Sequence, residues 1–168
     1  ASLAPSEMCI RDSLRAMNQT APSLPLDPQV ERIVRDSFAR QGLMHHLGAE
    51  LHEVARGRVS IRLPFRETLT QQHGYFHAGG TSAIADSAGG YAGFTLFPPD
   101  SSVLTVEFKI NLLAPAQGDY LEAVGTVVRS GRTLTICQLE VFGVTEQGRA
   151  QVALGQQTLI CLQGKQDR

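Results

Sequence analysis

The chain has 168 residues, a length that fits one domain with a single buried core. Its 42% hydrophobic and 18% charged residues are typical of a globular protein, and a formal net charge of -1 gives no electrostatic indication of nucleic-acid binding. The three cysteines, Cys9, Cys137 and Cys161, form no Cys-x-x-Cys pair, so we expect neither a disulfide framework nor a zinc site. Such sparse cysteines also lead us to expect a cytoplasmic location.

The N-terminal residues show no pattern of a structural element. Residues 1–13 lack periodicity, and their PSEMCIRDS portion resembles translated vector or adapter sequence. The beginning of the chain has no apolar run typical of a secretory signal, and the charge-free stretch 68–85 contains glutamines, histidines and glycines that a bilayer core disfavours. We therefore expect a flexible, partly non-native tail over residues 1–26 and one domain over residues 27–168, without export or membrane insertion.

A helix and a hairpin are predicted first along the chain. Residues 27–41 place apolar residues at helical spacing, and we expect Gly42 to end this helix. Residues 47–65 then alternate with period two, which is typical of strands, and Arg56-Gly57 divides this run into a hairpin.

The segment from His77 to Phe97 is predicted to be a second helix of unusual composition. Glycines interrupt its alanine-rich sequence at five positions, Gly79, Gly80, Gly89, Gly90 and Gly93. Each interior glycine costs about 1 kcal/mol relative to alanine. Because propensity disfavours this helix, we expect its small side chains to let a curved sheet pack closely around it.

The rest of the chain is predicted to form strands. Alternation of apolar and polar residues covers segments 103–114, 119–130, 132–143 and 149–162, and glycine-containing turns separate them. Such short connections predict that successive strands are antiparallel neighbours. In the first segment the alternation predicts one continuous apolar face, made by Leu104, Val106, Phe108, Ile110 and Leu112. The whole pattern predicts an α+β domain.

Asp86 is the one residue with a formal charge between Glu67 and Asp100, and it lies in the middle of the glycine-rich helix. A buried carboxylate would lose hydration with no Lys or Arg close by in sequence. Two interpretations remain open. Asp86 is a functional carboxylate, or it lies on a solvated helix face or accepts a bond from a hydroxyl such as that of Ser82, Ser87 or Thr105.

The approach to this helix is a second candidate. Glycines at a helix start, here Gly79 and Gly80, let a ligand reach free backbone N–H groups where the helix dipole favours negative charge, although a loop with unusual dihedrals would also need them. Besides His73 and His77, the segment contains no metal ligand except Asp86, so we expect no metal site. We expect His77 to cap or orient the helix start.

Nucleophilic catalysis by a serine or cysteine has little support. Ser82 and Ser87 lack the G-x-S-x-G pattern of a nucleophile elbow. Cys137 and Cys161 lie in predicted strands, where buried, inert thiols are expected.

The run HAGGTSAIADSAGGYA, in which aspartate follows histidine by nine positions, resembles the hotdog-fold acyl-CoA thioesterases of the phenylacetate-degradation type, within the 4-hydroxybenzoyl-CoA thioesterase superfamily. The resemblance extends over most of residues 45–162 and includes Gly74, the strand TVEFKINLLAPA and the SGRT turn at residues 130–133. It implies a curved antiparallel sheet wrapped around a central helix, with an extra helix at the N-terminal side.

The resemblance also implies roles for individual residues. Asp86 acts as general base on water or as nucleophile on the thioester carbonyl, and the N–H of Ala78 stabilises the developing oxyanion. Gln71 orients the water or carbonyl, and Thr105 assists beside Asp86. The chain departs from the pattern at two positions, because Ala78 replaces a glycine and Gln71 is one methylene longer than the usual asparagine, and both changes predict altered substrate fit.

The implied substrate is an acyl-CoA thioester, so coenzyme A enters as part of the substrate and no separate cofactor is expected. Arg129 and Arg132 with Gly131 are candidates for binding its phosphates, although they also fit solvated charges at a strand end. Gly79 is a candidate contact to the substrate. The helix start of one subunit meets the aspartate of another, which implies a homodimer, often paired into a tetramer, and an inactive monomer.

We thus expect hydrolysis of aryl- or medium-chain acyl-CoA. Two alternatives belong to other classes. One is a non-catalytic acyl-CoA-sensing module, although the chain shows no DNA-binding appendage. The other is a hotdog hydratase or dehydratase with a histidine such as His77 as the principal base.

Overall fold

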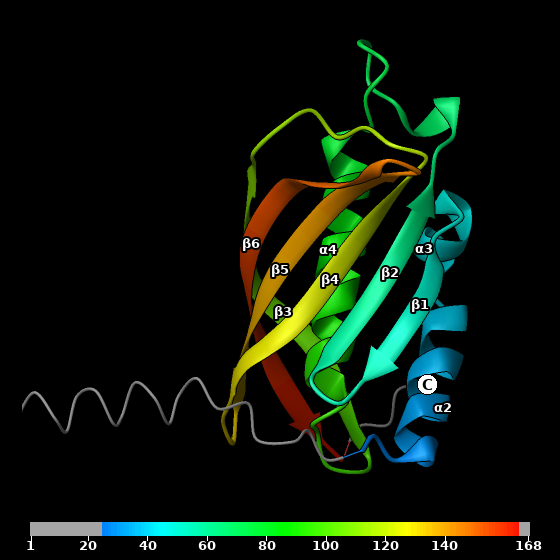
Figure 1. Ribbon diagram of the computed structural model, residues 1–168. Coiled ribbons are helices and arrows are strands. Elements are labelled where there is room, and N and C mark those ends of the chain that lie inside the picture. The colour runs from blue at the N-terminus through cyan, green and yellow to red at the C-terminus, as the bar shows by residue number, and fades with distance from the viewer. Residues whose placement is uncertain (1–24, 165–168) are drawn as a thin grey trace, which may run out of the picture.

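The computed structural model describes residues 25–164 (Figure 1). Residues 1–24 of the predicted N-terminal tail, with Cys9 and the PSEMCIRDS segment, lie outside the described residues. No helix within residues 25–164 has the length and apolar composition needed to cross a membrane.

The first predicted helix is confirmed as α2, Pro28–Ala39. Asp27 caps it, because its side chain accepts a hydrogen bond from the Gln29 N–H at 2.8 Å, and Pro28 occupies a first-turn position that needs no N–H donor. The predicted stop at Gly42 is wrong. Gly42 instead begins a short helix, α3, Gly42–Leu47, which buries Met44 in the core and ends at Gly48 in the left-handed conformation.

Six strands form one antiparallel sheet. They are β1 Glu50–Ala55, β2 Arg58–Pro64, β3 Ser101–Leu112, β4 Tyr120–Ser130, β5 Leu134–Thr145 and β6 Gly148–Gln163. Their order in the sheet is β1-β2-β4-β5-β6-β3. The predicted hairpin at Arg56-Gly57 and the predicted β4–β5 and β5–β6 neighbours are confirmed.

One predicted neighbour is wrong, because β3 pairs with β6 and not with β4. The connection from β3 to β4 does not make a tight turn. It crosses the end of the curled sheet and is held there by the hydrogen bond from the Phe76 N–H to the Ala116 carbonyl at 2.9 Å (Figure 1). As a result β3 lies at one edge of the sheet.

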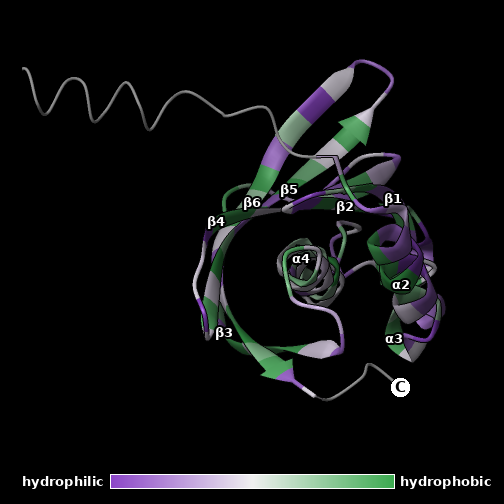
Figure 2. Ribbon diagram, turned by 90° about the horizontal axis from the view of Figure 1, so that it is seen from below, coloured by the Kyte–Doolittle hydropathy of each residue, from purple (hydrophilic) through white to green (hydrophobic). Residues whose placement is uncertain are grey.

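The glycine-rich segment forms α4, Ala78–Phe94, which ends three residues before the predicted boundary. The sheet curves around this helix, and α2 and α3 lie beside β1 (Figure 2). A Cβ at Gly89 would overlap the side chain of Gln157, and one at Gly93 would overlap that of Leu159. These two glycines therefore admit the sheet, which is the compensation that their low helix propensity predicts.

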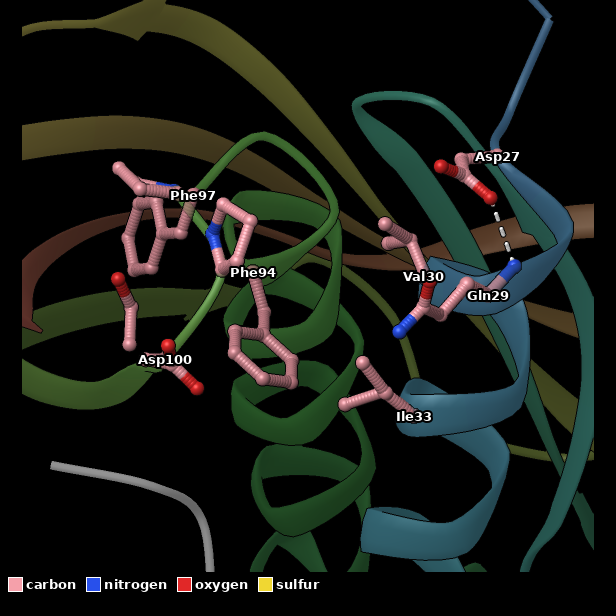
Figure 3. Close-up of a pocket in the computed structure, with 10 residues that line it drawn as sticks. Asp27, Gln29, Val30, Ile33, Phe94, Phe97 and Asp100 are labelled. Carbon is pink, nitrogen blue, oxygen red and sulfur yellow. Dashed lines mark hydrogen bonds between the residues drawn. The ribbon is translucent and has the colours of Figure 1, made fainter.

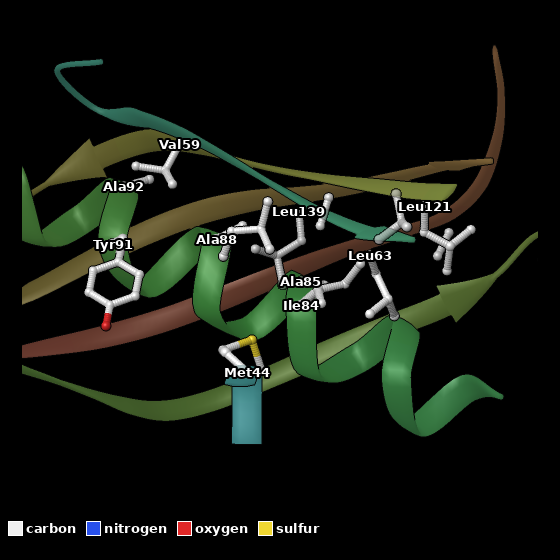
Figure 4. Packing of buried hydrophobic residues seen from close by; sticks show 14 of the residues in the cluster. Met44, Val59, Leu63, Ile84, Ala85, Ala88, Tyr91, Ala92, Leu121 and Leu139 are labelled. Atoms are coloured by element: carbon white, nitrogen blue, oxygen red, sulfur yellow. The ribbon is translucent and has the colours of Figure 1, made fainter. Parts of the chain in front are cut away.

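The core lies between α4 and the concave face of the sheet (Figure 4). Ile84 and Ala88 on the helix are fully buried against strand residues such as Leu63, Leu121 and Leu139. A helix enclosed by a curved antiparallel sheet is the hotdog fold, and the predicted α+β class is confirmed.

The predicted continuous apolar face of β3 is wrong. A β-bulge between Thr105 and Glu107 changes the register against β6, so residues before and after it at the same spacing point to opposite faces. Val103 and Ile110 pack against the core, whereas Leu104 is 55% exposed. Before the bulge, Thr105 pairs with the buried Leu159, and its hydroxyl reaches Asp86 on α4.

Candidate active site

Asp86 lies half-buried in the middle of α4, where strands β3 and β6 approach the helix. Its Oδ1 accepts a hydrogen bond from Thr105 Oγ1 at 2.8 Å and another from Gln157 Nε2 at 2.6 Å. Its Oδ2 has no hydrogen-bond partner among the described residues. The two donors fix one carboxylate oxygen and leave the other for an incoming group.

Gln157 is a site residue that the sequence-based predictions missed. It is fully buried, and its Nε2 also lies 3.1 Å from the Asp86 carbonyl oxygen and 2.9 Å from Thr105 Oγ1. Its Oε1 has no hydrogen-bond partner among residues 25–164. Alternation along β6 offers a signal, because Gln157 shares the inward register of Gly155 and Leu159.

The contact with Thr105 agrees with both interpretations of Asp86 that the sequence leaves open, namely a site carboxylate and a carboxylate that satisfies a neighbouring hydroxyl. A cavity of about 310 Å³ adjoins the carboxylate. Its walls come from Ser37 on α2, from Gln41 at the start of α3, and from residues of α4 and β3. Those residues are Asp86, Ser87, Gly90 and Tyr91 on α4, and Val103, Leu104 and Thr105 on β3. A carboxylate placed in the wall of such a cavity is positioned to meet a ligand.

His77 caps α4, as the sequence predicts. Its Nδ1 accepts a hydrogen bond from the Gly79 N–H at 2.9 Å, and its carbonyl accepts from the N–H groups of Gly80 and Thr81. No acceptor for the Ala78 N–H is found among the described residues. The Ala78 N–H is thus the donor at this helix start that is left for a ligand, whereas that of Gly79 is already used.

The helix start and Asp86 do not meet within one chain. Eight residues of α4 separate Ala78 from Asp86, which is roughly 12 Å at 1.5 Å per residue. Gln71 lies on the loop before α4, where its Oε1 accepts a hydrogen bond from the His73 N–H and its own N–H donates to the Tyr75 carbonyl at 2.8 Å. The structure therefore brings together Asp86 and Thr105, and places Gln71, His77 and Ala78 elsewhere.

The SGRT turn lies between β4 and β5, and Arg129, Gly131 and Arg132 are all exposed. Thr105 on β3 pairs with Leu159 on β6, which pairs with Thr135 on β5. Two interstrand spacings, roughly 10 Å, therefore separate Thr105 from the strand that begins at this turn.

The remaining candidates do not form a second centre. Cys137 is fully buried, and burial raises the pKa of its thiol from 9.0 to about 12, which makes it a poor nucleophile. Cys161 is half-buried. Within residues 25–164, His, Cys, Asp and Glu side chains nowhere gather in threes as metal ligands would.

The fold and this site define a hotdog protein with a carboxylate on its central helix. Residues 73–149 match the family described as the thioesterase superfamily. The crystal structure of a thioesterase family protein from Silicibacter pomeroyi is 43% identical, with a TM-score of 0.78 over 80% of this chain and 99% of that chain. The chain belongs to the thioesterase superfamily.

Curated relatives agree with this assignment. A protein of Halobacterium salinarum, named only provisionally as an esterase, is 30% identical over 122 residues, which cover 68% of this chain and 80% of that protein. The 1,4-dihydroxy-2-naphthoyl-CoA hydrolase of Listeria monocytogenes is 26% identical over 106 residues, which cover 63% of this chain and 86% of that enzyme.

Proposed function

We propose that this protein hydrolyses acyl-CoA thioesters and that Asp86 is the carboxylate at the reacting centre. The observation that carries the proposal is the position of Asp86, because Thr105 and Gln157 hold Oδ1 while the side chain borders an open cavity. Family membership supports thioester chemistry, and one relative is named for the hydrolysis of an aromatic acyl-CoA. The motif resemblance supports the phenylacetate-degradation type within this superfamily.

Two routes use the second oxygen of Asp86. As a general base, Oδ2 takes a proton from water while the water oxygen bonds to the carbonyl carbon, and the proton then passes to the sulfur as the C–S bond breaks. As a nucleophile, Oδ2 bonds to the carbonyl carbon and expels the thiolate, and water then cleaves the mixed anhydride. In both routes negative charge develops on the carbonyl oxygen, which needs a donor such as the Ala78 N–H.

A second copy of the chain supplies that donor in our proposal, because the chain's own Ala78 lies too far along α4. The edge strand β3 has no strand partner on its outer side among the described residues, and apolar side chains are exposed along it and just beyond it. They are Leu104, Val106, Phe108, Leu112 and Leu113. An apolar, unpaired edge of this kind favours pairing with another chain, and further pairing into a tetramer follows the family resemblance.

We assign Arg129 and Arg132, with Gly131 between them, to the phosphates of coenzyme A. Their exposure leaves the guanidinium groups accessible to an anion. Gln71 and Gly79 are assigned to the carbonyl end of the substrate, at the helix start of the second copy.

The test is a panel of acyl-CoA and acyl-carrier-protein thioesters, with release of free thiol as the readout. The proposal expects turnover of at least one acyl-CoA. Saturable acyl-CoA binding without turnover would support the sensing module instead, and hydration of an enoyl-CoA with its thioester left intact would support the hydratase.

A further inference from the structure

Gly90 is a glycine that the packing of the described chain does not require. Its neighbours in the sequence and along the helix, Gly89 and Gly93, leave no room for a Cβ because side chains of the sheet fill the space. A Cβ at Gly90 would meet nothing within 4 Å. A glycine inside a helix lowers the stability of the helix, and packing does not require one at position 90. The glycine therefore points to another use of the open space beside it.

That open space is the cavity beside Asp86. Gly90 follows Asp86 by four residues, so both lie on the same face of α4, and both line the cavity. The missing side chain at Gly90 exposes helix backbone as the cavity wall one turn beyond the carboxylate. A group bonded to a carbonyl at Asp86 would extend over this surface.

A hydrogen bond between two helices joins two residues that line this cavity. Ser37 Oγ on α2 and Tyr91 OH on α4 lie 3.1 Å apart, and both residues are buried. The rings of Phe38 and Tyr91 pack edge to face with their centroids 6.0 Å apart, which supports the position of the tyrosine.

A second cavity of about 410 Å³ lies one turn further along both helices (Figure 3). Ile33 on α2 and Phe94 on α4 face each other across it, and Phe97 forms another part of its apolar wall (Figure 3). Along α4, Tyr91 lies between Asp86 and Phe94, and along the chain Ser37 lies between Ile33 and Gln41, so the pair falls between the residues that line the two cavities.

We propose that the acyl group of the substrate lies over Gly90 and ends at the Ser37–Tyr91 pair, so that the enzyme selects compact acyl groups, single rings or short chains, over long chains. This inference rests on the proposed thioesterase function. It assigns Gly90 and Tyr91 as specificity-determining residues and names the second cavity as the space from which long chains are excluded.

The test compares acetyl-, benzoyl-, hexanoyl- and decanoyl-CoA as substrates of the full chain and of two variants. Gly90→Val fills the cavity with a branched side chain, so kcat/KM for benzoyl- and hexanoyl-CoA should fall roughly 10-fold or more, while that for acetyl-CoA changes much less. Tyr91→Leu removes the hydroxyl and the ring from the end wall and should raise kcat/KM for decanoyl-CoA relative to hexanoyl-CoA by roughly 10-fold.

The outcomes separate this inference from the function on which it rests. Absence of hydrolysis of every thioester by the unmodified protein would overturn the proposed function. In Gly90→Val, an equal fall in kcat/KM for all acyl groups would overturn the acyl site, because the open space would then serve folding or subunit contact. This holds whether or not light scattering shows that the oligomer is lost. An unchanged chain-length preference in Tyr91→Leu would overturn the end wall.

Discussion

Replacing Gln157 tests how the carboxylate of Asp86 is held. Gln157→Met keeps an unbranched side chain of similar length and removes the Nε2 that donates to Asp86 Oδ1 at 2.6 Å. A hydrogen bond to a charged group is worth about 1.5–3 kcal/mol, so kcat should fall roughly 10- to 150-fold if the bond holds Asp86 in its reactive position.

Stability should respond differently to the same substitution. The variant loses the hydrogen bonds of Nε2, but it also removes Oε1, which is buried without a partner among the described residues. These effects oppose each other, since an unpaired buried polar atom costs about 1–3 kcal/mol, and we expect the free energy of unfolding to change by about 1 kcal/mol or less.

The assays are thiol release for kcat and thermal unfolding for stability. Gln156→Met is a matched control, because Gln156 is the preceding residue of β6, is exposed and points to the other face of the sheet. If Gln157→Met keeps the kcat of the unmodified protein, or if Gln156→Met loses as much activity, the Nε2 bond does not hold Asp86 in its reactive position.

Three further predictions concern packing, a thiol and the edge strand. Gly89→Ala should lower the free energy of unfolding by about 1–3 kcal/mol through overpacking, whereas Gly90→Ala should raise it by about 1 kcal/mol, and urea unfolding with equal losses would contradict this contrast. Because burial raises the pKa of Cys137 to about 12 in the folded state, its contribution to stability is complete below pH 9.0 and declines above it. Accordingly, maleimide at pH 8 should leave Cys137 unlabelled in the native protein, and mass spectrometry showing rapid native labelling would contradict its burial. Phe108→Lys should yield an inactive monomer in light scattering, since it places a charge on the exposed apolar edge, and an active monomer would rule out a site shared between subunits.

Local patterns predicted most of the elements, because each depends on residues close together in sequence. Alternation identified the hairpin of β1 and β2, and the glycines of α4 correctly indicated a helix enclosed by a sheet. Asp86 is recognisable in the sequence as an isolated charge in that helix, and Thr105 is one of the hydroxyls that the sequence offers as its partner.

Features that depend on distant contacts were missed. The pairing of β3 with β6 and the bulge after Thr105 follow from how the sheet closes around α4, which no local pattern records. Gln157 lies 71 residues beyond Asp86, and its role becomes visible only when β6 is placed against the helix. Helix α3 is short enough that the burial of Met44, and not its propensity, determines it.

The rate of thioester hydrolysis by purified Asp86→Asn protein, measured beside the unmodified protein, decides whether the Asp86 carboxylate takes part in the reaction. Asparagine keeps the shape of the side chain and an oxygen that can accept from Thr105 and Gln157, but it has no negative charge and neither takes up a proton nor attacks a carbonyl. We predict that kcat falls by roughly 10²- to 10⁴-fold while thermal unfolding and oligomeric state stay unchanged. Hydrolysis at an undiminished rate by a folded Asp86→Asn protein would contradict the assignment of Asp86 to the reacting centre.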